Sequence, residues 1–485
     1  MKQLSPNKVD VFKKKSSLPI WSTKLSNSLV YWAMAIFFLL APFSVSSLFQ
    51  RITPLPSSVL VTCACLAILG ITFIQTMEKE NKLLIDTLSI PKELKLFLYG
   101  LYIPMGLSIL AAAYNVSIVT SNEYLSYVLN SMPTRTLNLF LFLGIIIFFM
   151  KQLHLFSEQQ LKKILHFYIV AIVILCLVGI WQFLHFLIGY PFIPLSSRAY
   201  VHSVDQDVLF NFRLTSLTDE PSFLVPFLVD GIILSYFLIQ NKTKYFLYMV
   251  LPALFVLIFS FSVSGYANLL LLLLFVLFLF VLTVMDRKDK KRILLFSSLG
   301  LATGIILLTV TWPLWNGLLQ PILGRFDTLF DIEKHSRLFM LVMPFVWLFD
   351  YSLVNGLFGF GPGSYEFLAN TKFLYHQGPL SATSNNVFVD LVFEHGVVGG
   401  GVFLAVFLYV FWYFFKKRKQ DPYYLCGLLL WFQLGITSLY RSDFASPRFW
   451  VLVICVFVFA ELAKRRMRTG NSEKVISGGE IRDRL

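Results

Sequence analysis

Residues 266–285 read YANLLLLLLFVLFLFVLTVM, a run without a single charged side chain. About 20 apolar residues in an α-helix are long enough to cross the hydrocarbon core of a bilayer. A helix that is apolar on every side needs either a large protein core or lipid around it. This stretch therefore predicts a membrane-spanning helix.

Similar apolar runs recur along the whole chain, and together they predict its fold class. The chain of 485 residues is 57% hydrophobic and only 14% charged, whereas a soluble domain carries about 25% charged residues. We expect an all-α polytopic membrane protein with about twelve transmembrane helices. The predicted spans are 29–49, 57–76, 95–114, 135–151, 164–188, 221–239, 245–263, 266–285, 293–313, 387–415, 424–440 and 446–463.

The net charge of +14 comes largely from short clusters of Lys and Arg between the apolar runs. The clusters are 13–15, 162–163, 287–292, 416–419 and 464–466. All of them fall on one side of the membrane if the N-terminus is cytoplasmic, and basic loops are a mark of the cytoplasmic side. We therefore expect both termini in the cytoplasm, and the charge gives no reason to expect a nucleic-acid partner. The chain has no P-loop, which argues against ATP-driven transport.

This topology divides the chain into five parts. They are a basic cytoplasmic N-terminal tail (1–28), transmembrane helices one to nine (29–313, with an outer loop at 189–220), a large periplasmic or extracellular loop (314–386), transmembrane helices ten to twelve (387–463) and a cytoplasmic tail (464–485). The large loop contains an amphipathic stretch, Leu338 to Tyr351, which we expect to form a helix lying at the outer membrane interface.

A minority of basic residues is predicted on the outer side, against the general trend. They are Arg51, Arg135, Arg198, Arg213, Arg325, Lys334, Arg337, Lys372, Arg441 and Arg448. A guanidinium group stays charged and binds phosphate through paired donors. Several such groups near the outer leaflet predict a cavity for an anionic lipid headgroup.

Three outward motifs refine this hypothesis. The stretch 211–223, NFRLTSLTDEPSF, places Arg213 before an acidic pair and the proline that opens a span. Ser336 and Arg337 are followed by GLFGFGPGS at 356–364, whose glycines permit a tight turn and a close backbone approach to a ligand. In 383–399, TSNNVFVDLVFEHGVVG, a helix that begins near Asn386 carries two carboxylates on one face. Carboxylates at the outer end of a membrane helix are costly and usually functional.

In their order and spacing, these three stretches resemble the O-antigen ligase and O-antigen polymerase family over residues 205–400. The resemblance implies a glycosyltransferase of the bacterial inner membrane whose active site faces the periplasm. Such an enzyme takes glycans from an undecaprenyl diphosphate carrier and passes them to an acceptor hydroxyl. It requires no nucleotide sugar, cofactor or metal.

The resemblance also implies roles for individual residues. Arg213 and Arg337 engage the donor diphosphate, while Asn385, Asn386 and Glu394 line the acceptor side. Arg325, Arg441 and Gly361 complete the predicted substrate-binding set. The acceptor hydroxyl needs a proton acceptor, and three candidates for this base remain open: Glu220, Glu394 and His376.

One departure from the family pattern bears on the choice of function. Ligases have a His directly before the Asn, where this chain has Asn385. That favours a polymerase of lipid-linked repeat units, making an O-antigen, capsule or exopolysaccharide, over a ligase that transfers finished polymer to the lipid A core of lipopolysaccharide. A flippase or transporter for lipid-linked oligosaccharide is the alternative from another class. A polymerase implies donor and acceptor glycans on the carrier lipid and a protein that regulates chain length.

Overall fold

The computed structural model describes residues 20–46, 49, 57–80, 90–119, 121–193, 212–239, 243–284, 337–372 and 383–482. Every regular element within these ranges is helical, which confirms the all-α prediction. The predicted span 293–313 and much of the predicted outer loop 314–386 lie outside the described residues.

Eight helical stretches of the described chain are long and apolar enough to cross a membrane. Their main helices are α1 (Ile20–Leu40), α3 (Ser57–Glu80), α4 (Lys92–Asn115), α6 (Met132–Gln152), α7 (Glu158–Ile188), α8 (Pro221–Leu238), α10 (Val263–Val284) and α16 (Val387–Lys417). Large apolar side chains, among them Leu270 and Leu273 of α10, are exposed on the surface of the bundle, where lipid suits them better than water. The chain has the architecture of a multi-pass membrane protein.

Three further predicted spans coincide with the helices α9 (Thr243–Phe259), α17 (Pro422–Ser438) and α18 (Pro447–Arg482). The first two have only 17 residues each, and α18 carries charged residues at both ends of its apolar part. The number of twelve spans stays a prediction.

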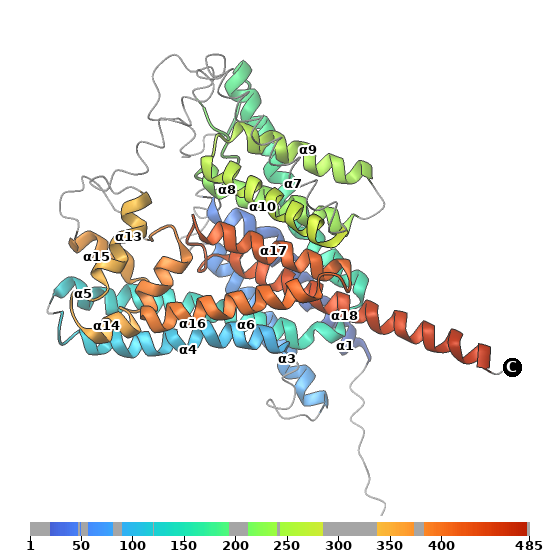
Figure 1. Cartoon of the computed structure of the whole chain (residues 1–485), viewed down its shortest axis with the longest axis horizontal. Helices are drawn as coiled ribbons and strands as arrows, with labels where there is room; N and C mark the ends of the chain where they lie inside the picture. Colours follow the sequence, from blue (N-terminus) through green and yellow to red (C-terminus); the bar gives the residue numbers. More distant parts are fainter. Residues whose placement is uncertain are drawn as a thin grey trace, which may run out of the picture.

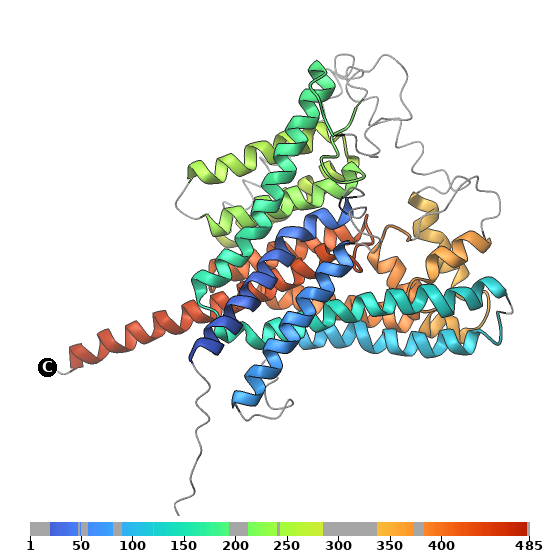
Figure 2. The same ribbon diagram turned by 180° about the vertical axis from the view of Figure 1, so that it is seen from behind.

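Helix α18 runs through the middle of the bundle. Nearly every side chain from Phe449 to Ala463 is buried, and α18 packs against α17, α6 and α7 (Figures 1 and 2). Around it, α1 packs on α3 and α7, and α8 lies against α7, α9 and α17. An all-apolar helix in this protein is therefore not always a lipid-facing one.

At one side of the bundle, α16 lies along α4, and three short helices cover this pair (Figure 1). They are α13 (Arg337–Trp347), α14 (Leu353–Phe358) and α15 (Ser364–Lys372). Helices α13 and α15 share a small apolar core with α16 that includes Phe339, Trp347 and Phe393. The predicted amphipathic helix is thus present as α13, although it ends at Trp347 rather than Tyr351. Its place at a membrane interface stays a prediction.

The chain before α6 is helical as well, although no span was predicted there. Ser121 caps the short helix α5 (Asn122–Ser126) by accepting a hydrogen bond from the backbone of Tyr124 at 3.0 Å. A single π-type turn, η2 (Tyr127–Ser131), then leads directly into α6. This continuous helix positions Tyr127 and Arg135 against the glycine-rich turn described below.

Candidate functional site

The loop 439–446 between α17 and α18 is the meeting point of three helix N-termini. The Asn386 side chain at the start of α16 donates a hydrogen bond to the Leu439 carbonyl at 3.1 Å. Arg441 donates to the carbonyl of Phe223 in the first turn of α8, also at 3.1 Å. We call this region, formed by the loop 439–446 and the N-terminal turns of α6, α8 and α16, the polar end.

Helix α16 begins where the sequence predicted. Asn386 is its N-cap, and the Asn386 side-chain oxygen accepts hydrogen bonds from the backbone of Phe388 and Val389 at 3.0 and 3.2 Å. One turn later, the buried Asp390 accepts hydrogen bonds from the Ser384 backbone at 2.8 Å and from the Ser442 hydroxyl. Asn386 and Asp390 therefore fix the start of α16 to the loop 439–446.

Glu394 lies one further turn along the same face of α16. It is 1% exposed, and its carboxylate accepts a hydrogen bond from the Gly363 backbone. Its second oxygen, Oε2, is buried without a hydrogen bond in the described structure. Buried polar atoms are rarely left without partners in native proteins. The free lone pairs of Glu394 therefore mark a place where a ligand can bind.

Arg135, near the start of α6, lies within electrostatic range of both Glu394 and Asp390. Its guanidinium carbon is 4.7 Å from the centre of the Phe444 ring, a cation–π contact with the loop 439–446. Its Nε and Nη2 atoms are buried and make no hydrogen bond within the described residues. Arg135 thus contributes two N–H donors, and Glu394 one acceptor oxygen, that have no hydrogen-bond partner within the described residues. These groups lie in the same region of the fold.

A break in α16 sets the position of Glu394. Gly396 has φ +74°, a non-helical conformation inside the helix. The carbonyls released by this break accept hydrogen bonds from the glycine-rich turn, Phe360 to Phe393 at 3.3 Å and Gly361 to Glu394 at 2.9 Å. The close approach that the glycines permit is thus between two backbones. Gly361 holds the backbone of Glu394 in place.

On the other side of the polar end, the buried Arg441 lies between α8 and the loop 439–446. Its guanidinium carbon is 4.2 Å from the Phe223 ring centre, and it interacts electrostatically with Asp443 and Glu220. Burial lowers the pKa of Arg441, while the charge of Asp443 acts in the opposite direction. The structure therefore brings together the predicted site residues Arg441 and Glu220.

Arg213 belongs to the segment that leads into α8. Gln182 of α7 holds this segment by accepting hydrogen bonds from the backbones of Thr215 at 2.9 Å and Ser216 at 2.8 Å. Leu214 donates to the Phe259 carbonyl at 3.0 Å. The backbone that follows Arg213 is therefore held against α7 and α9.

A buried ion network lies behind the polar end. Arg448 donates to Asp230 of α8 through Nε and Nη2, both at 3.0 Å, and to Asp443 through Nη1 at 2.8 Å. The Tyr168 hydroxyl of α7 donates to Asp230 at 3.1 Å. This network connects α7, α8 and α18 to the loop that carries Arg441.

The remaining predicted site residues are placed as follows. Asn385 has φ +59°, and its amide approaches the sulfur of Met340 on α13 at 3.4 Å. Arg337 is the first residue of α13. Arg325 and His376 lie outside the described residues. Among the described residues, no cluster of His, Cys, Asp or Glu could hold a metal ion.

Sequence reasoning did not select Arg135, Tyr365 or Gln182 as site residues. Arg135 was recognised only as one of several outer basic residues, because no local motif surrounds it. Gln182 carries a usable signal, since a polar side chain inside an apolar span is costly. Tyr365 has no such signal, because its burial depends on how α15 packs against α16.

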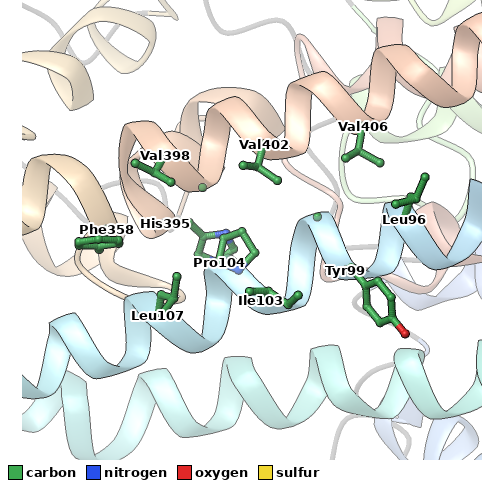
Figure 3. Close-up of a pocket in the computed structure, with 12 residues that line it drawn as sticks. Leu96, Tyr99, Ile103, Pro104, Leu107, Phe358, His395, Val398, Val402 and Val406 are labelled. Carbon is green, nitrogen blue, oxygen red and sulfur yellow. The ribbon is translucent and has the colours of Figure 1, made fainter.

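A groove of about 270 Å³ runs between α4 and α16 and ends beside the break in α16 (Figure 3). Its walls are apolar and include Ile103, Val398 and Val402. His395 lies at one end of the groove, and neither of its buried ring nitrogens has a hydrogen-bond partner in the described structure. The groove therefore leads along two membrane helices to the residue next to Glu394.

Comparison with protein-family models found no matching family, and comparison with curated proteins found no matching relative.

Proposed function

We propose that this protein is a membrane glycosyltransferase that polymerises undecaprenyl-diphosphate-linked oligosaccharide repeat units into a surface polysaccharide. The observation that carries the proposal is the convergence of the polar end. Phe223, Gly361, Asn386 and Arg441 mark four segments that meet there, although they are far apart in the sequence. Parts of all three motifs of the family resemblance thus lie in one region of the fold, which supports the proposal.

The chemistry of this region suits glycosyl transfer from a lipid diphosphate. The leaving group carries its own negative charge, which arginines such as Arg213 and Arg441 stabilise. The attacking hydroxyl needs a proton acceptor. Of the three candidates, Glu394 has the best support, because it is buried and keeps one oxygen without a hydrogen bond within the described residues. We therefore assign it as the base.

The groove between α4 and α16 supports a lipid substrate. A polyisoprenoid chain is apolar and lies in the bilayer, so it can enter laterally between two membrane helices. The groove is lined by aliphatic side chains and approaches Glu394 through His395. A soluble nucleotide sugar has no apolar chain that could occupy such a groove.

A transporter of lipid-linked oligosaccharide is the second candidate, and the break in α16 is the observation that favours it. However, the carbonyls released at this break are bound by the glycine-rich turn, so they are not available to coordinate a transported ion. The buried Asp230, which stands out within a span, is paired with Arg448. A ligase remains the nearest enzymatic alternative.

Enzyme and transporter can be separated with the purified full-length chain in detergent, where no second compartment exists. The substrate is the lipid-linked material that accumulates in a strain lacking the gene. We expect polymer to form without nucleotide sugar, and Glu394→Gln to abolish it with unchanged protein folding. Single repeat units that stay unpolymerised would contradict the proposal. Long lipid-linked chains accumulating in the deletion strain would instead indicate a ligase.

A further inference from the structure

We propose that Arg135, Glu394 and Tyr365 form a subsite for neighbouring hydroxyl groups of a sugar. This inference rests on the proposed function and names the acceptor side of the same site. None of the three residues uses its full hydrogen-bonding capacity within the described structure, and they come from three elements, α6, α16 and α15.

Tyr365 is the third member of the cluster. It is 1% exposed, and its ring contacts Phe393, the residue before Glu394, in a T-shaped arrangement with centres 6.2 Å apart. Its hydroxyl has no hydrogen-bond partner among the residues that the structure describes. Burial and the nearby charge of Asp390 raise the pKa of Tyr365. The hydroxyl therefore remains a donor as well as an acceptor.

The unused groups match a sugar. Arg135 offers N–H donors, Glu394 offers an acceptor, and Tyr365 offers both. Each sugar hydroxyl also both donates and accepts, so two adjacent hydroxyls can satisfy a guanidinium and a carboxylate together. Sites built from such paired donors and acceptors discriminate strongly, because the wrong ligand leaves buried polar groups unpaired.

A phosphate group does not suit this cluster. Asp390 and Glu394 both lie within electrostatic range of Arg135 and of each other, so two carboxylates face one guanidinium. A further anion would be repelled there, since like charges at close range in a buried site are strongly unfavourable. Arg441 also has two carboxylates within electrostatic range, Asp443 and Glu220, but Arg448 adds a second guanidinium there, so we expect the diphosphate nearer Arg441.

In the transfer step, the acceptor hydroxyl oxygen forms a bond to the anomeric carbon of the donor. The bond between that carbon and the phosphate oxygen breaks, and its electron pair leaves with the lipid diphosphate. The hydroxyl proton passes to Oε2 of Glu394. Arg135, which lies within electrostatic range of this carboxylate, holds the hydroxyl next to the one that reacts.

The test measures binding without turnover. The full-length chain in nanodiscs is examined by saturation-transfer NMR with methyl glycosides of common hexoses, deoxyhexoses and N-acetylhexosamines, and by phosphorus NMR with inorganic pyrophosphate. We expect at least one glycoside to bind the wild type, more weakly in Arg135→Gln by about tenfold or more and in Tyr365→Phe by about fivefold. Pyrophosphate binding should persist in both variants and decrease in Arg441→Gln.

The controls separate binding from folding. Tyr365→Phe removes a hydroxyl that makes no hydrogen bond to any residue the structure describes, so its thermal stability should equal that of the wild type. Arg466→Gln makes the same change as Arg135→Gln at a half-exposed arginine far along α18, and it should leave glycoside binding unchanged. The inference is overturned if no glycoside binds the wild type better than Arg135→Gln, or if Arg135→Gln abolishes pyrophosphate binding. Failure of the polymerisation assay with intact glycoside binding would refute the proposed reaction and leave this subsite standing.

Discussion

Arg448 binds Asp230, Asp443 and Thr437 with one guanidinium group, in a region where all four side chains are buried. A buried ion pair contributes little net stability compared with a well-packed apolar pair, but breaking one partner is costly because the other charge remains buried. The network joins α8 and α18 to the loop 439–446. It therefore orients the loop that carries Arg441 and Ser442.

Replacing Asp230 by Ala should destabilise the protein by about 3–5 kcal/mol, because Arg448 loses the partner of two of its nitrogens. The measurement is the thermal unfolding of the full chain in detergent, compared with wild type. The double variant Asp230→Leu with Arg448→Met should recover much of the loss, since it removes both charges together. An Asp230→Ala variant that is as stable as wild type but inactive would argue for a transport role instead.

Only some residues of the candidate site could be predicted from the sequence. The spacing of Asp390 and Glu394 follows from helical periodicity, so their common face could be predicted. The approach of Arg135 to Glu394 depends on how α6 packs near α16, and no local pattern in the sequence encodes that distance. Residues whose function depends on contacts between helices were therefore the ones missed.

At the scale of elements, the break in α16 is the decisive feature. Hydropathy predicted one continuous span at 387–415, because most residues on both sides of Gly396 are apolar. The structure shows a helix whose first part, from Val387 to His395, is tied to the polar end. The backbone of the glycine-rich turn fills the gap at the break. Hydrophobic periodicity cannot predict such a break, since the glycine-rich turn that binds the released carbonyls lies in another segment of the sequence.

Replacing Gly396 by Ala should destabilise the break and reduce activity. Gly396 has φ +74° and ψ 176°, a conformation essentially confined to glycine that costs other residues about 1–3 kcal/mol, and a Cβ at this position would collide with the carbonyl of Leu357. The matched control is Gly401→Ala in the same helix, where a Cβ has open space and helix propensity should stabilise by up to about 1 kcal/mol. Thermal unfolding and polymer formation are measured for both. Equal behaviour of the two variants would contradict a structural role for the break.

At the scale of the whole molecule, hydropathy was sufficient to locate most helices and insufficient to arrange them. The predicted spans and the described helices agree closely, because only a helix satisfies its own backbone in lipid. Hydropathy gave no reason to place α18 in the centre, since lipid and a protein core both accept apolar side chains. The positions of the charged residues, rather than hydropathy, indicate how the bundle is oriented in the membrane.

Basic residues gather at the end of the bundle opposite the polar end. Arg465 of α18 donates to the carbonyls of Phe156 and Leu153 at 2.6 and 2.9 Å, and Lys416 and Lys417 end α16. If this basic end is cytoplasmic, the polar end faces outward, as the proposed reaction requires. Single cysteines test this in intact cells, in a background where Cys63, the exposed native cysteine among the described ones, is replaced by Ser. A membrane-impermeant thiol reagent should label Asn122→Cys directly and Gln420→Cys only after the membrane is opened. The reverse pattern would place the polar end inside the cell and remove the support for a reaction at the outer face.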